Sequence, residues 1–214
     1  MTQLDLTGPF EVFARMPGVT TLLLWKTLDP VRTDRGLMLI PTATFEACPA
    51  LDLVCVPGGP GQVALMEDQV VLRFLRQTAP TCRYITSVCT WSLVLGAAGL
   101  LKGYRATTHW ASHDQLAILG AEAVDARVVF DRNRITCAGV TSGIDFALAM
   151  VAQLAGEELA KQIQLEMEYE PAPPFSSGSP LSAGPIVTAQ VMAKIAALQA
   201  RRRKVTLRAA AALE

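Results

Sequence analysis

Short apolar stretches alternate with longer amphipathic patterns along most of the chain. Residues 51–56 and 82–88 are strand-like, because they are short, apolar and rich in β-branched or aromatic residues. Between them, apolar residues over 70–75 recur on one helical face, and a long apolar helix is predicted from 142 to 155, before Gly156. This alternation predicts an α/β domain with a mostly parallel sheet and helices on both faces.

The remaining elements follow from the same patterns and from the positions of glycine and proline. A helix is expected to start near Thr7 with Pro9 in its first turn, and the helix after residue 89 is expected to close at Gly103. We further expect strands at 20–25, 36–40 and 105–108, a hairpin over 127–138, and helices at 110–119, 157–169 and 186–200.

The C-terminal part of the chain has a different composition. Residues 171–185 are rich in proline, serine and glycine, which predicts an irregular segment. We therefore expect one α/β domain over 1–170, with residues 171–214 forming this segment and a C-terminal helix that packs on the same domain.

Composition and charge exclude some classes of partner. Hydrophobic residues make up 51% of the 214, and 19 basic residues balance 19 acidic ones, so no net charge draws the chain to nucleic acid or to an anionic membrane. The basic run at 201–204 lies where a helix would end and complements its dipole. With neither a signal peptide nor an uninterrupted membrane-length apolar segment in view, we expect a cytoplasmic protein without nucleic-acid or membrane partners.

The chain contains five cysteines, an odd number, and none of them forms a C-x-x-C pair. This usage argues against a disulfide framework or a metal site and is typical of a reducing compartment.

Cys89 has the most informative position, because it stands where a predicted strand turns into a helix. The unpaired N–H groups of a helix's first turn would favour a thiolate there and lower its pKa, which makes Cys89 a candidate nucleophile. A buried cysteine acting as a small hydrophobic residue is the alternative. The segments 57–59, 89–90 and 138–141 all follow predicted strands, and ligands of parallel sheets bind at that edge.

Several of these segments together resemble a known superfamily. Residues 3–9 (QLDLTGP), 56–59 (VPGG), 87–90 (SVCT), 106–110 (ATTHW) and 141–148 (TSGIDFAL) are similar to the motifs of the ThiJ/PfpI superfamily. The tail at 165–175 (LEMEYEPAPPF), with the nearby GSP, is most similar to the isocyanide hydratases of that superfamily.

The resemblance implies a flavodoxin-like three-layer sandwich, a homodimer and no cofactor. It also implies a lyase whose nucleophile is Cys89 and whose acidic partner is Asp5. The thiolate would attack the terminal carbon of a small organic isocyanide to give a thioimidate, and Asp5 would move protons and guide water, releasing an N-formamide.

Other residues receive supporting roles from the same comparison. Gly58, Gly59 and the N–H of Val140 are expected to stabilise charge near the sulfur, and the Thr90 hydroxyl is expected to cap the helix and touch sulfur or substrate. His109 and Trp91 are expected to lie beside the residues that touch the substrate, without touching it themselves. Thr90 stands where the proteolytic members of the superfamily carry a histidine, which argues against a protease.

Two other functions share the fold. One is a ligand-sensing regulatory module lacking its DNA-binding region, which residues 186–214 are too short to supply as a helix-turn-helix pair. The other is a stress-related protein acting on reactive aldehydes, which pairs the cysteine with a glutamate where this chain has Asp5.

The chain departs from the superfamily pattern in two places. Relatives carry a strand before the aspartate motif, whereas only residues 1–4 precede Asp5 here, so we expect two exposed interior strand edges, a frayed Asp5 and reduced stability. Trp91 replaces a glycine and is expected to narrow the pocket toward small isocyanides.

Overall fold

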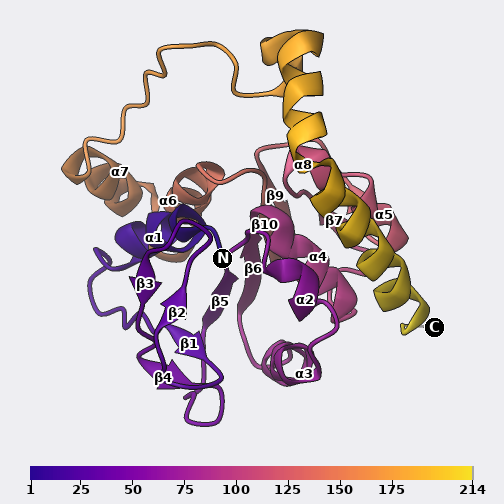
Figure 1. The fold of residues 1–214 in the computed structure, drawn as a ribbon. Coiled ribbons are helices and arrows are strands. Elements are labelled where there is room, and N and C mark those ends of the chain that lie inside the picture. The colour runs from indigo at the N-terminus through magenta and orange to yellow at the C-terminus, as the bar shows by residue number, and fades with distance from the viewer. Residues whose placement is uncertain (214) are drawn as a thin grey trace.

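The computed structural model describes residues 1–213, which fold around a four-stranded sheet (Figure 1). Its order is β5-β6-β10-β9, with β5, β6 and β10 parallel and β9 antiparallel to β10. This arrangement confirms the predicted α/β fold and the hairpin. The strands are β5 (Leu53–Val56), β6 (Tyr84–Val88), β9 (Val128–Asp131) and β10 (Arg134–Cys137).

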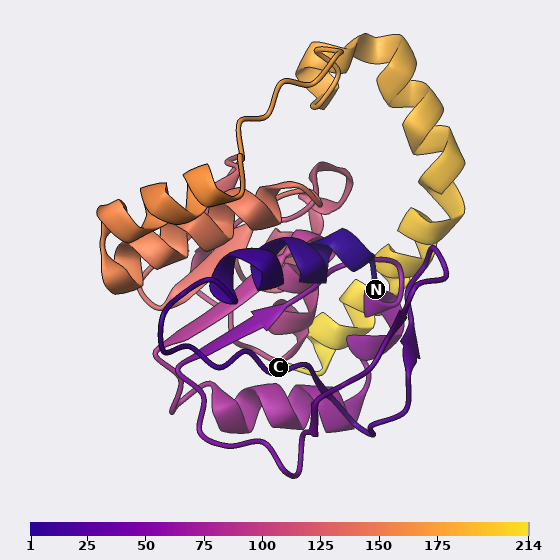
Figure 2. The same cartoon turned by 90° about the vertical axis from the view of Figure 1, so that its left-hand side faces the viewer.

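Helices cover both faces of the sheet and produce three layers (Figures 1 and 2). One face carries α1 (Gln3–Phe13), α6 (Ser142–Ala155) and α7 (Glu157–Glu166). The other carries α2 (Gln62–Leu65), α3 (Gln69–Thr78), α4 (Ser92–Ala97), α5 (Gln115–Ile118) and part of α8 (Pro180–Ala211).

The sheet separates two apolar cores, because successive side chains of a strand point to opposite faces. Val54 and Val56 of β5 enter the core under α3, α4 and α8, whereas Leu53 and Cys55 pack on the core under α1 and α6. A strand buried on both faces needs the continuous apolar run that predicted it.

Six strands of two residues each form three small sheets beside the central one. They are β1 (Leu24–Trp25) with β4 (Ala43–Thr44), β2 (Val31–Arg32) with β3 (Met38–Leu39), and β7 (Arg105–Ala106) with β8 (Glu122–Ala123). Within residues 1–213, β1 pairs only with β4 and β5 pairs only with β6. A largely apolar cavity of about 800 Å³ separates the free sides of β1 and β5.

The N-terminal helix differs from the expectation. Helix α1 begins at Gln3, not near Thr7, so Pro9 lies inside it and Asp5 lies in its first turn. The expectation of a frayed Asp5 is wrong, because this side chain is completely buried. Backbone hydrogen bonds hold the segment: the Thr2 N–H donates to the Gly58 carbonyl and the Asp34 N–H donates to the Met1 carbonyl, both at 2.9 Å.

Two other helix boundaries also differ. The helix after Cys89 opens with a 3₁₀ turn, η1 (Cys89–Trp91), and α4 stops at Ala97 because Gly99 adopts a left-handed φ of 77° two residues later, well before Gly103. The expected helix over 110–119 is divided into a 3₁₀ turn, η2 (Trp110–Ser112), and α5.

The C-terminal helix is longer than expected. A capping box between Ser179 and Ser182 starts α8 inside the segment predicted to be irregular, and a kink at Gly184 follows. The first half of α8 projects from the body, while Val205 and Ala209 in its second half are buried (Figure 2). An 18-residue stretch of this helix has a mean hydropathy of 1.4, high enough for a membrane span, but the last turns of the helix belong to the core of the domain.

Phe146 should be the largest single contributor to the core under α1. It is fully buried and meets Phe13 of α1 edge-on, with ring centroids 6.1 Å apart. We expect Phe146→Ala to lower the free energy of unfolding by about 3–5 kcal/mol in urea titrations. Phe130→Ala, at a side chain that is 40% exposed, is the matched control and should cost far less. Equal losses in the two variants would contradict this description of the core.

Candidate active site

Three loops meet where the parallel strands end. The register pairs Val56 of β5 with Ser87 of β6, and Cys137 of β10 with Val88 of β6. The residues that follow are therefore neighbours: Gly58 after β5, Cys89 after β6, and the turn containing Val140 after β10. This edge is where ligands bind in open parallel sheets.

Cys89 occupies a sharp turn with a left-handed φ of 58°, a conformation that costs a non-glycine residue about 1–2 kcal/mol. The surrounding structure holds this turn in place. The Cys89 carbonyl accepts hydrogen bonds from the Thr108 hydroxyl at 3.0 Å and from the Ser92 hydroxyl at 3.3 Å. A strained residue kept at a strand end by its neighbours is typical of a functional site.

Asp5 of α1 lies against Cys89, and Gly58 packs beside both residues. A Cβ atom placed on Gly58 would lie 2.4 Å from Asp5 Oδ2 and 2.7 Å from Cys89 Cβ. Only glycine fits this point, because any side chain would force the carboxyl group and the cysteine apart. The sequence separates Asp5 and Cys89 by more than eighty residues, and the fold brings them together.

The surroundings of Asp5 keep its carboxyl group protonated up to about pH 7. Burial raises its pKa to about 7, although the nearby Cys89 thiol and the Gly58 N–H partly oppose this rise. Within the described chain, neither carboxylate oxygen has a hydrogen-bond partner of good geometry. A carboxyl group with this pKa can both donate and accept a proton near neutral pH.

The thiol of Cys89 does not have the lowered pKa that its position predicted. Burial and the negative charge of Asp5 raise its pKa to about 12, and the Thr90 N–H and the Arg202 guanidinium oppose this rise only in part. The expectation is wrong because the sulfur is out of water and the charge of Asp5 acts on it. Above about pH 7, Asp5 and Cys89 therefore hold one proton between them.

The glycines and Thr90 join the first two loops. The Gly59 N–H donates to the Thr90 hydroxyl at 3.4 Å, and Gly59 has a φ of 114°, which favours glycine. A Cβ atom on Gly59 would also lie 2.3 Å from the backbone nitrogen of Thr2. Gly59 thus allows the close approach of the N-terminal segment that carries Asp5.

His109 and Trp91 occupy supporting positions. The Nδ1 atom of His109 accepts a hydrogen bond from the Ala111 N–H at 3.3 Å, and burial lowers the pKa of the imidazole, which is therefore neutral. Trp91 is only 6% exposed and lines the apolar cavity, which also reaches Asp5.

Two residues near the site escaped the sequence analysis. Gln62 of α2 donates from Nε2 to the Thr90 carbonyl at 3.4 Å, and Arg202 of α8 donates from Nε to Gln62 Oε1, also at 3.4 Å. Arg202 belongs to the basic run at 201–204 that was predicted to complement a helix dipole, yet it is only 4% exposed. Its spacing from Val205 and Ala209, which share one helical face, is the signal that could have revealed its burial.

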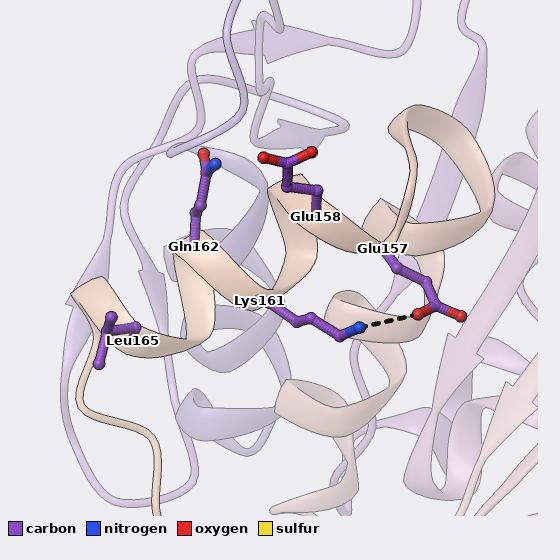
Figure 3. A pocket seen from close by; sticks show the side chains of 5 residues that line it. All are labelled: Glu157, Glu158, Lys161, Gln162 and Leu165. Carbon is purple, nitrogen blue, oxygen red and sulfur yellow. Dashed lines mark hydrogen bonds and ion pairs between the residues drawn. The ribbon is translucent and has the colours of Figure 1, made fainter.

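A second hollow, away from this edge of the sheet, is less suited to hold a ligand. No group of three potential metal ligands occurs in residues 1–213. A shallow hollow over α7 is lined by Glu157, Glu158, Lys161, Gln162 and Leu165, and its only internal contact is the Lys161–Glu157 pair at 2.9 Å (Figure 3). One exposed helix supplies all five side chains, so no second element is present to enclose a ligand.

Comparison with known proteins gives a consistent result. The model of the DJ-1/PfpI family matches residues 1–153. The chain is 54% identical to an isonitrile hydratase of Pseudomonas putida over 211 residues, which cover 99% of this chain and 92% of that protein. It is 33% identical to the HTH-type transcriptional regulator GbdR of Pseudomonas aeruginosa over 70% of this chain, but only 42% of the regulator.

Among solved structures, a THiJ/PfpI family protein from Pseudomonas syringae superposes with a TM-score of 0.94 and 45% identity. The match covers 96% of this chain and 86% of that one. The similarity thus extends through the C-terminal helix as well as the central sheet.

The buried carboxyl group of Asp5 should make the stability of the fold depend on pH. An unfolded aspartate ionises near pH 4, whereas folded Asp5 keeps its proton to about pH 7. Between these values the folded state binds more protons, so stability should fall as pH rises, by up to about 4 kcal/mol. Urea unfolding of wild type and Asp5→Asn from pH 4 to pH 8 measures this effect.

The variant should lose most of the decline, and Asp125→Asn, at an exposed carboxylate, is the control that should keep it. A wild-type protein whose stability is flat or rises over this interval would show that Asp5 is not held protonated.

Proposed function

The chain belongs to the DJ-1/PfpI family, and from that premise we propose that it is an isocyanide hydratase, a lyase that adds water to an organic isocyanide and gives an N-formamide. The observation that carries this proposal is the 54% identity to an isonitrile hydratase over nearly the whole of both chains. The regulator matches more distantly and over less than half of its own length.

The first step joins the isocyanide to Cys89. The sulfur forms a bond to the terminal carbon of R–N≡C, and the one proton shared by Cys89 and Asp5 passes to the same carbon. The product is a thioimidate, R–N=CH–S–Cys89, and Asp5 is left as a carboxylate. The close approach of the two groups at Gly58 supports this step, because the proton and the sulfur must reach one carbon atom.

The second step hydrates the thioimidate. Asp5 takes a proton from a water molecule, the hydroxide adds to the carbon, and the nitrogen receives that proton from Asp5. The resulting tetrahedral adduct collapses to R–NH–CHO: its hydroxyl proton goes to Asp5, and sulfur leaves as a thiolate. The pKa of about 7 suits Asp5 to both directions of transfer.

Neighbouring groups are proposed to stabilise charge during these steps. The N–H groups of Gly58, Gly59 and Val140 lie on loops at the same sheet edge, and Thr90 supplies a hydroxyl beside the nucleophile. We propose that His109 and Trp91 shape this environment without contacting the reacting atoms. The bulk of Trp91 narrows the pocket and so favours small isocyanides.

We also propose a cytoplasmic homodimer. The five cysteines are free, which suits a reducing compartment. The projecting half of α8 exposes apolar side chains, among them Leu181 at 94% and Ile186 at 74%, and a second copy of the chain would cover them. Because Val205 and Ala209 enter the main core, residues 171–214 are proposed to belong to the same domain.

The nucleophile is tested by single substitutions. We expect Cys89→Ser to lower kcat/KM for formamide production from a small isocyanide by on the order of 10³-fold or more, since the covalent step is lost. Asp5→Asn should lower it by about 10²–10⁴-fold, the range of general acid–base catalysis. Cys48→Ser, on a partly exposed loop thiol, is the control and should keep the wild-type rate. A Cys89→Ser variant with most of its activity would rule out the nucleophile.

The dimer is tested by light scattering. We expect a molar mass twice the 22.9 kDa of one chain, and a shift toward the single-chain value in Ile186→Asp, which places a charge on the exposed apolar face. Lys194→Asp changes charge on an exposed position of the same helix and serves as the control. A wild-type molar mass equal to that of one chain would contradict the proposed dimer.

A further inference from the structure

Arg202 is a buried cation that makes no direct ion pair within residues 1–213. Its side chain donates from Nη1 to the Ser112 hydroxyl at 3.0 Å and from Nε to Gln62 Oε1 at 3.4 Å. No ion pair joins Arg202 to a carboxylate within residues 1–213, whereas the adjacent Arg203 pairs with Asp114 at the surface. A buried charge is costly unless another group compensates it.

A hydrogen-bonded chain connects this guanidinium to the turn that holds Cys89. Gln62 is 1% exposed; it accepts from Arg202 through Oε1 and donates through Nε2 to the Thr90 carbonyl at 3.4 Å. The guanidinium therefore fixes which way the amide of Gln62 points. The C-terminal helix is tied in this way to the residue that follows Cys89.

The charges in this region balance when Arg202 and the reacting pair are counted together. Above about pH 7, Asp5 and Cys89 share one proton and carry one negative charge. His109 is neutral, because burial and Arg202 both lower its pKa, and burial raises the pKa of Cys137 in β10. The N-terminal ammonium acts on Asp5, where Asp34 opposes it, whereas Arg202 is the cation that acts on the sulfur of Cys89.

We propose that Arg202 is the counter-charge of the Asp5–Cys89 pair, acting through Cys89 and not on the substrate. The attraction is mutual: Arg202 lowers the pKa of the Cys89 thiol, and Cys89 raises the pKa of Arg202 against the effect of burial. The guanidinium stabilises sulfur as a thiolate both when it attacks and when it leaves. This role rests on the proposed function of Cys89 and adds a residue from α8 to it.

The experiment measures the thiol without an isocyanide, so its result does not depend on the hydratase activity. Iodoacetamide alkylation of Cys89 is followed against pH by mass spectrometry of the peptide that contains it. We expect Arg202→Gln to move the profile upward by at least about one pH unit, which makes alkylation at pH 7 about tenfold slower. Arg202→Lys retains the charge and should stay close to wild type.

Two further variants separate charge from structure. Gln62→Glu keeps Arg202 but gives it a carboxylate partner, so it should shift the profile in the same direction as Arg202→Gln. Arg203→Gln removes a neighbouring exposed cation and should leave the profile unchanged. Urea unfolding of each variant shows which of them fold.

The proposal is overturned if folded Arg202→Gln alkylates Cys89 with the wild-type pH profile. If Arg202→Gln does not fold, a folded Gln62→Glu with an unshifted profile overturns it equally. An equal shift in Arg203→Gln would also contradict it, because the effect would then come from the general charge of α8.

Discussion

The close contact of two buried acidic groups, the carboxyl of Asp5 and the thiol of Cys89, is the constraint on which the rest of the structure depends. Both groups are out of water, so neither ionises at its ordinary pH, and together they retain a proton that solvent would otherwise remove. Keeping them together requires a glycine at position 58, a strained turn at Cys89 and an N-terminal segment bonded to the Gly58 carbonyl.

Separate parts of the chain meet these requirements. Parallel strands bring Gly58 and Cys89 to one edge, and α1, packed on α6 through Phe13 and Phe146, delivers Asp5 to the same edge. The C-terminal helix completes the environment from the opposite face of the sheet with a buried guanidinium. The proposed nucleophile, its proposed proton carrier and the proposed compensating charge thus come from three layers of one fold.

The sequence alone predicts those elements whose formation depends on residues close together in the chain. The buried strands, the hairpin of β9 and β10, and α6, which runs from Ser142 to Ala155 as expected, all follow from apolar spacing and glycine positions. The motifs of the superfamily predicted that Cys89 and Asp5 act together in one site. The burial of Asp5, the raised pKa of Cys89 and the inward face of Arg202 depend on contacts across tens to hundreds of residues, which local pattern does not encode.

We infer that a carbon–sulfur bond forms at Cys89 while Asp5 transfers the proton, and intact-protein mass spectrometry tests this inference directly. Asp5→Asn, mixed with a small isocyanide and quenched in acid, should trap the thioimidate when its hydration becomes slower than its formation. We expect a mass increase of one isocyanide, located by digestion on the peptide that contains Cys89. An unchanged mass during continued turnover, or an adduct on another cysteine, would contradict it.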